Sequence, residues 1–306
     1  MFIQVHNNTI DDELDNLLSV VNKSSNNKLK ILYENKNTDI SLRVKRMQWH
    51  IDGVIYHYRN MKKYYYLLSK DVAMRVSPFE DGSYPSALLF YDAIAPNLYH
   101  ELYAFINLYR ISIDMFIKLL HHQFTNKKSL PKSINKFKSN ESDCGVLKRI
   151  AKDSFVNYFI DLRNCINHYR SFAVGNNIVA FSEDLNDDER KKIGRDDEIW
   201  LQSEFRIENQ GVIVYNIYLP DSIYENKQHD VLVKNFTFDE KKNLLSYSLW
   251  AIRQMALSYV ESLELIGSDN YFTYSSNINT NEEIKYRPIT DYFDVFSLPY
   301  KIIPLY

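Results

Sequence analysis

Hydrophobic side chains recur at helical spacing along most of the chain. Over residues 39–74 they follow one another at steps of three to five, in a stripe that begins at Leu42 and includes Tyr65. Such a period places these side chains on one face of an α-helix. Pro96 is expected to break or kink the next helix. The same spacing predicts further helices over residues 14–21, 86–124 and 146–172.

The period changes in the second half of the chain. Apolar and polar residues alternate over 199–207 and again, after a turn, over 213–219, which is the spacing of half-buried strands. These two runs predict a β-hairpin, and 178–181 is a candidate third strand. Helical spacing then returns: residues 237–240 read Thr-Phe-Asp-Glu, which fits a capping box, and Gly267 marks the end of a last helix.

These elements predict a mainly α-helical fold. We expect a helical bundle over residues 81–267, with a small β-hairpin inserted at about 178–220 before its last helix. Residues 1–80 are expected to form an N-terminal helical extension. The segment 268–306 is aromatic and punctuated by proline without a clear period. It is expected to pack on the body as irregular structure.

The composition is that of a globular protein with little net charge. Hydrophobic residues make up 45% and charged residues 25% of the 306, which excludes wholesale disorder. The formal net charge is −2, so any nucleic-acid binding must come from local patches. The N-terminus has no secretory pattern, and no stretch approaches the ~18 uncharged residues of a membrane span. We therefore expect a soluble, cytoplasmic protein with no membrane partner.

The sequence offers no convincing cofactor or metal site. It has seven glycines and contains neither G-x-G-x-x-G nor G-x-x-x-x-G-K-[ST], so a glycine-rich phosphate-binding loop is not expected. Two cysteines, Cys144 and Cys165, are too few for a disulfide framework or a Cys-rich zinc site. His50 and His57 share a predicted helix face but lack carboxylates at ligand spacing. No resident cofactor or metal is expected.

Residues 161–170 carry the most informative polar side chains. When this segment is placed on a helix at about 100° per residue, its apolar residues form a stripe that must face the core. Arg163, Asn164, Asn167 and His168 then fall on the opposite side, within about 140° of one another. A solvated helix face usually carries Lys and Glu. Four groups that can bind phosphate or move a proton are unusual there.

The pattern Arg163-Asn164-x-x-x-His168 resembles the signature of the HEPN domain superfamily. That signature is R-(x)4–6-H, with a polar residue, often Asn, directly after the Arg. HEPN toxins that are paired with a nucleotidyltransferase extend the motif as H-x-Y. Here Tyr169 follows the His directly and Arg170 takes the expected place of the tyrosine. Modification of a motif tyrosine by a partner is therefore not expected.

This resemblance covers about residues 86–266 and implies both a fold and an activity. The implied fold is an HEPN-like bundle, and the implied activity is metal-independent endoribonuclease activity in a homodimer joined through the motif face. The RNA 2′-OH would be the nucleophile, His168 the acid or base and Arg163 the phosphate-binding group, with Asn164 orienting the His or contacting phosphate.

The resemblance also implies a biological setting, which is prokaryotic defence or a toxin–antitoxin pair with an antitoxin or regulatory partner. The alternative is a non-catalytic HEPN-like dimer that binds RNA, a nucleotide or a protein.

Several other residues are candidates to assist the motif or to guide RNA. Glu101 and Asp114 lie on the helix expected to neighbour the motif helix, so either is a candidate partner of the motif residues. Tyr64-Tyr65-Tyr66 follows two lysines and mixes aromatic and basic groups as RNA-stacking surfaces do, although a half-buried amphipathic helix explains it as well. The lysines of 127–138 and Arg190-Lys191-Lys192 are candidates to guide an RNA backbone, or simply remain in water.

Overall fold

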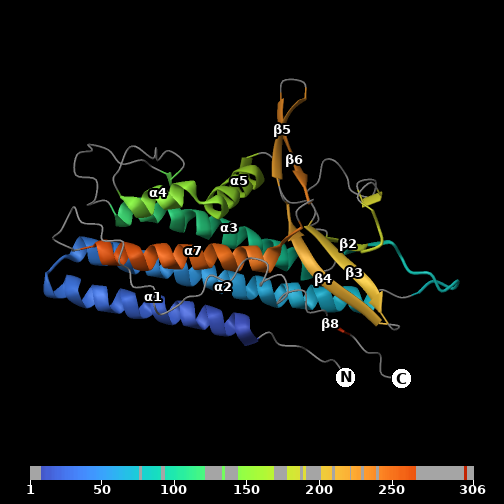
Figure 1. Cartoon of the computed structure of the whole chain (residues 1–306), viewed down its shortest axis with the longest axis horizontal. Coiled ribbons are helices and arrows are strands. Elements are labelled where there is room, and N and C mark those ends of the chain that lie inside the picture. The colour runs from blue at the N-terminus through green and yellow to red at the C-terminus, as the bar shows by residue number, and fades with distance from the viewer. Residues whose placement is uncertain are drawn as a thin grey trace.

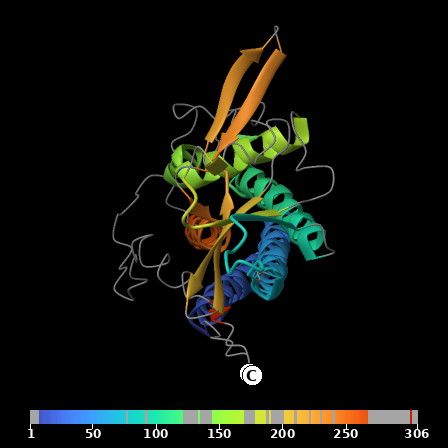
Figure 2. The ribbon, with the colours of Figure 1, turned by 90° about the vertical axis from the view of Figure 1, so that its right-hand side faces the viewer.

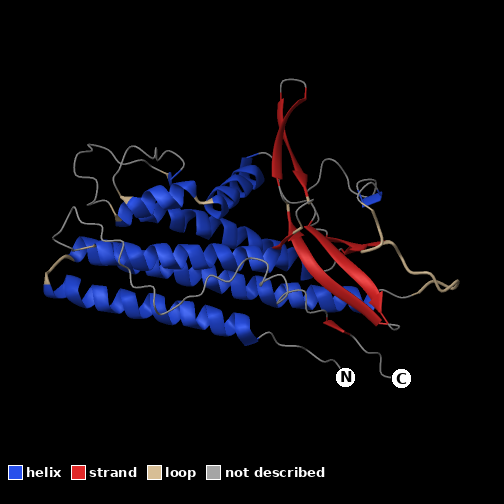
Figure 3. Ribbon diagram, viewed as in Figure 1, coloured by secondary structure: helices blue, strands red, loops and turns tan. Residues whose placement is uncertain are grey.

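The computed structural model of the chain is mainly helical, with a small sheet at one end of a helical bundle (Figures 1 and 3). It describes residues 8–75, 78–90, 94–120, 133–134, 144–168, 178–186, 189–190, 201–208, 211–220, 222–228, 231–238, 241–266 and 300–301. Its helices are α1 (Asn8–Glu34), α2 (Thr38–Arg75), α3 (Ile94–Leu119), α4 (Gly145–Lys152), α5 (Ser154–His168) and α7 (Leu244–Leu265). Its strands are β1 (Ala87–Phe90), β2 (Ile178–Ser182), β3 (Leu201–Glu208), β4 (Gly211–Leu219), β5 (Ser222–Gln228), β6 (Val231–Thr237), β7 (Lys242–Asn243) and β8 (Tyr300–Lys301). The prediction of a mainly α-helical fold with a small β-element is thus confirmed.

The helices α1, α2, α3 and α7 run along the long axis of the molecule, and α4 and α5 lie over α3 (Figure 1). The apolar stripes predicted from the sequence meet in one core, in which Tyr58, Phe105, Phe116 and Tyr259 are fully buried. Removing a large apolar side chain from water contributes about 1.5–3 kcal/mol. The first residue of the predicted α2 stripe is an exception, because Leu42 is 53% exposed.

The N-terminal helices are part of this same core. α2 packs so closely on α3 that a Cβ atom on Gly53 would lie 2.5 Å from Cδ2 of Leu108. Tyr259 of α7 reaches α1 and α2, where its hydroxyl lies 2.9 Å from the hydroxyl of Ser25 and donates to the carbonyl of Val44. The boundary at residue 80 between an extension and a bundle stays a prediction.

The sheet covers one end of the bundle and runs in the order β1-β2-β3-β4-β7, with β8 also paired to β4. β2 and β3 are parallel, and the other pairs are antiparallel. Two buried tyrosines fasten the sheet to the helices: the hydroxyl of Tyr99 accepts from the backbone N–H of Leu201, and that of Tyr65 from the N–H of Ile217. Tyr65 is therefore a structural residue and not part of a stacking surface. The strands β5 and β6 form a separate hairpin that projects from the body (Figure 2).

The predicted strands at 178–181, 199–207 and 213–219 are confirmed by β2, β3 and β4. Two predicted helices, however, have the wrong bounds. Residues 87–90 belong to strand β1 instead of the helix predicted over 86–124, because four consecutive apolar residues fit a buried strand as well as a helix. The helix predicted over 146–172 is divided at Asp153, whose backbone is extended and whose carboxylate caps α5.

The start of the last helix is also corrected. Thr237 ends strand β6, so the sequence Thr-Phe-Asp-Glu over 237–240 does not form the predicted capping box. The cap of α7 is Asn243, whose Oδ1 accepts from the backbone N–H groups of Leu245 and Ser246, both at 3.0 Å. The sequence pattern of a capping box also fits the end of a strand. The β5–β6 hairpin was not predicted from the sequence.

The predicted irregular tail falls mostly outside the described residues. Within it the structure describes β8, which adds Tyr300 and Lys301 to the edge of β4. None of the described helices combines the length and the apolar character that a membrane span requires.

Candidate functional site

Aromatic side chains hold α5 against α3 and α7. The fully buried ring of Phe159 lies 5.6 Å from the ring of Phe105 and 5.3 Å from that of Tyr109, both on α3. On the other flank, the rings of Phe155 and Tyr247 of α7 are 4.7 Å apart. These contacts fix which side of α5 faces the core.

Arg163 and Asn164 lie at the edge of this packed side and contact each other. Nη1 of Arg163 donates to Oδ1 of Asn164 at 3.3 Å, and both side chains are half-buried. The sequence predicted that they lie opposite the core; in the structure both are half-buried, and the charge of Arg163 lies near Tyr103 of α3. Because Oδ1 accepts from the guanidinium, the amide nitrogen of Asn164 is the atom that can donate to a phosphate oxygen.

Tyr103 of α3 is a neighbour of the motif that sequence reasoning missed. Its hydroxyl donates to the carbonyl oxygen of Ile166 at 3.4 Å, which ties the turn between Arg163 and His168 to α3. Burial raises the pKa of Tyr103, although the nearby charge of Arg163 opposes the rise. The hydroxyl therefore stays protonated near neutral pH and remains a donor. No pattern in the sequence gives the register of α3 against α5, so no signal pointed to this residue.

His168 is the last described residue of α5. Its side chain, like those of Cys165 and Asn167, lies outside the part of the chain that the structure describes. His168 follows Arg163 by five positions, which is about 140° around an ideal helix. An ideal helix therefore does not direct both positions at the same atom.

Glu101 and Asp114, the two candidate partners on α3, have other contacts. Glu101 faces α2, where its Oε2 lies 2.7 Å from Nδ1 of His57. Oδ1 of Asp114 accepts from Nη1 of Arg110 at 2.7 Å and from the backbone N–H of Ile134 at 2.8 Å. These contacts explain both carboxylates without the motif.

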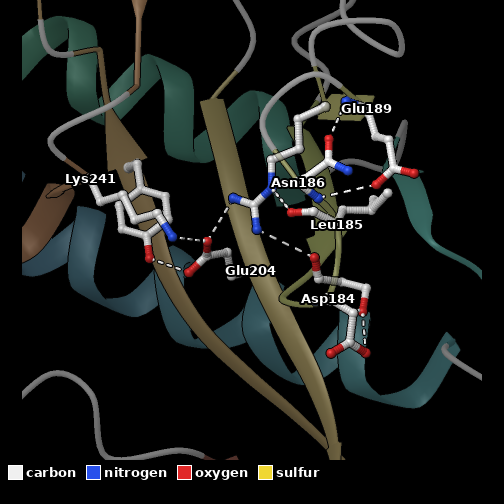
Figure 4. Close-up of polar contacts among 9 residues, drawn as sticks. Asp184, Leu185, Asn186, Glu189, Glu204 and Lys241 are labelled. Atoms are coloured by element: carbon white, nitrogen blue, oxygen red, sulfur yellow. Dashed lines mark hydrogen bonds and ion pairs between the residues drawn. The ribbon is translucent and has the colours of Figure 1, made fainter.

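A second polar cluster lies on the sheet around Glu204 (Figure 4). Oε1 of this buried carboxylate accepts from Nη1 of Arg190 and from Nζ of Lys241, each at 2.7 Å, and Oε2 accepts from the hydroxyl of Tyr218 at 2.6 Å. Burial by itself would raise the pKa of Glu204. The hydrogen bonds from Lys241, Tyr218 and Arg190 outweigh burial and lower it.

This cluster accounts for one of the basic residues that were candidates to guide RNA. Arg190 is occupied by Glu204 and also donates from Nε to the carbonyl of Leu185 at 3.0 Å. Its charge is thus used inside the fold, and guidance of RNA by the neighbouring lysines stays a prediction. Lys191, Lys192 and the lysines of 127–138 lie outside the described residues.

Among the residues that the structure describes, no group of three or more His, Cys, Asp or Glu side chains is arranged to hold a metal ion. The chain matched no protein-family profile, no curated protein sequence and no solved structure. The resemblance to HEPN proteins therefore rests on the motif and its place on α5.

Proposed function

We propose that the protein is a metal-independent endoribonuclease of the HEPN type, with Arg163, Asn164 and His168 as its catalytic residues. The observation that carries the proposal is the direct contact between the half-buried side chains of Arg163 and Asn164 on α5, about one turn before His168. A guanidinium held there by a neighbouring amide is pre-oriented for a phosphate, because its planar fork can donate two parallel hydrogen bonds.

The proposed reaction is an internal phosphoryl transfer. The 2′-OH of a ribose attacks the adjacent phosphorus while the bond to the 5′-oxygen of the next nucleotide breaks. One imidazole accepts the 2′-OH proton, and an imidazolium donates a proton to the leaving 5′-oxygen. Arg163 stabilises the charge that builds on the phosphate oxygens. The products are a 2′,3′-cyclic phosphate and a 5′-OH end.

We propose a homodimer, joined through the motif face, as the active form. Because Arg163 and His168 diverge around one helix, a two-fold axis near Asn164 would bring the Arg of one protomer toward the His of its partner. Such a dimer also supplies two histidines, one for each proton transfer. The setting we propose is prokaryotic defence or a toxin–antitoxin pair, with an antitoxin or regulatory protein as a partner.

The experiment is cleavage of a labelled RNA by the purified protein in excess EDTA, with the ends of the products mapped. Cleavage should proceed, and the products should carry 2′,3′-cyclic phosphate and 5′-OH ends. Loss of cleavage in EDTA with recovery on addition of magnesium would overturn the mechanism. Binding of RNA without cleavage of any RNA would instead favour the non-catalytic HEPN-like dimer.

A further inference from the structure

The helix α2 carries a concentration of positive charge along the described bundle. It has eight Lys and Arg against three Asp, a net charge of +5, in a protein whose overall formal charge is −2. Two of its arginines are partly neutralised, since Arg43 pairs with Asp39 of the same helix and Arg59 pairs with Asp15 of α1. Exposed Lys45, Arg46 and Lys63 add to the positive potential of this helix.

The same helix exposes large apolar side chains in a line. Leu42, Trp49 and Tyr56 are 53%, 69% and 61% exposed, respectively. They are spaced by seven residues, or about two helical turns, so they lie one above another along the outer side of α2. Single exposed apolar residues are common on protein surfaces, but an exposed tryptophan and an exposed tyrosine aligned on a charged helix are unusual.

Basic side chains flank the two aromatic side chains at both ends of this line. Lys45 and Arg46 precede Trp49, and Arg59 and Lys63 follow Tyr56. We call these six residues the α2 face. The exposed carboxylate on this stretch of the described helix is that of Asp52, between the two aromatic residues.

The helix α1 adds an aromatic ring beside the α2 face. Nζ of Lys45 lies 5.2 Å from the ring centre of Tyr33 of α1, which is itself half exposed. α2 lies between α1 and α3, away from the β5–β6 hairpin and from α5 (Figure 2).

We infer that the α2 face binds single-stranded RNA, with bases stacked on Trp49 and Tyr56 and phosphates paired with the flanking basic residues. Aromatic platforms within a positive groove are how proteins hold single strands without reading their sequence. On an ideal helix, positions 49 and 56 are about 10.5 Å apart along the axis, the length of about three stacked nucleotides. Only the choice of RNA over DNA rests on the proposed function.

The charges on this surface argue against two other partners, a second copy of the chain and a membrane. A second copy of the chain would set one helix of charge +5 against another, which costs free energy instead of supplying it. A membrane surface would favour a continuous apolar face, whereas here charged residues, including Asp52, interrupt the line of exposed apolar side chains. A polyanion with planar bases matches both the charge and the rings.

The test measures binding without cleavage. A fluorescent 15-nucleotide RNA with 2′-O-methyl groups lacks the attacking 2′-OH, so its anisotropy reports binding alone. The double variant Trp49→Ala/Tyr56→Ala should bind it at least tenfold more weakly, and Trp49→Phe should retain most of the affinity because stacking survives. The matched control is Phe79→Ala, which removes an exposed aromatic ring from a loop outside α2 and should bind like the wild type.

The salt dependence tests the phosphate contacts separately. Each lost phosphate contact should flatten the slope of log K against log salt by about 0.7. The double variant Arg46→Gln/Lys63→Gln should therefore flatten it by about 1.4, whereas Lys152→Gln, on α4, should leave it unchanged.

Several results would overturn the inference. These are wild-type affinity in the double aromatic variant, no binding by the wild type, or tighter binding of a DNA strand of the same sequence. A Trp49→Ala variant that loses only dimerisation in sedimentation, or only binding to anionic lipid vesicles, would assign the α2 face to those partners. The variant His168→Ala leaves the α2 face intact. If this variant and the wild type both bind the RNA but neither cleaves it, the proposed nuclease activity is contradicted and RNA binding by the α2 face is supported.

Discussion

Two tyrosines on α3 differ in whether their hydroxyl groups have a hydrogen-bond partner, so removing each hydroxyl should have a different effect. Tyr103 donates to the backbone of α5 beside the motif. Tyr109 is fully buried against Phe159, and its hydroxyl has no hydrogen-bond partner among the described residues. Removing the first hydroxyl loosens the turn that leads to His168, and removing the second relieves an unsatisfied buried group.

The variant Tyr103→Phe should therefore lower kcat for RNA cleavage about three- to tenfold, the range expected for one hydrogen bond. The Kd for uncleavable RNA should not change, since Tyr103 positions α5 and is not proposed to touch the substrate. Tyr109→Phe is the matched control, and urea unfolding should find it as stable as the wild type or more stable. Equal loss of kcat in both variants would show that Tyr103 has no specific role in positioning the motif.

At the level of elements, the helical period was the most informative signal. It predicted both ends of α2 to within one residue. An apolar stripe that continues over about ten helical turns is too long to be a strand. It failed where the pattern was short or ambiguous. The four apolar residues 87–90 fit either element, and Asp153 divides a stripe that continues in phase on both sides.

The candidate site was predictable only along one helix. The contact of Arg163 with Asn164 follows from their adjacency, but the neighbouring Tyr103 depends on how α3 packs on α5, which no local pattern encodes. Leu42 was assigned to the core for the same reason. Its spacing fits the apolar stripe of α2, and only the packing of α1 and α3 around that helix shows that it is exposed.

The Glu204 cluster joins β3, β4 and the segment before α7, so it should make the stability of the sheet depend on pH. The folded-state pKa of Glu204 is lowered. Its contribution to stability is thus complete above the unfolded pKa of about 4.3 and is lost as the pH falls through the folded value.

Glu204→Gln should consequently reduce the free energy of unfolding by about 3 kcal/mol at pH 7, because it removes the acceptor of a buried ion pair. Urea unfolding between pH 5 and pH 3 should show this difference shrinking, as the wild-type carboxyl becomes protonated. Glu80→Gln, at an exposed position, should follow the wild type at every pH. A difference that stays constant with pH would show that the charge of Glu204 is not what stabilises the sheet.

For the whole molecule, the small net charge conceals the positive charge of α2. A value of −2 argues against electrostatic binding of nucleic acid, yet one helix of the bundle carries +5. The sequence directed attention to Tyr64–Tyr66 and Arg190, and the structure uses Tyr65 and Arg190 internally. Binding on α2 and cleavage on α5 would then be separate properties of one fold, which single substitutions can separate.

The measurement that tests the central proposal most directly is the rate of RNA cleavage by His168→Ala, compared with the wild type in the same buffer with EDTA. If His168 transfers a proton in the reaction, the rate should fall by about 10²–10⁴. The unfolding free energy should change by no more than about 0.5 kcal/mol, and binding of the 2′-O-methyl RNA should not change. A folded His168→Ala protein that cleaves RNA at the wild-type rate would contradict the assignment of the motif on α5 as the catalytic site.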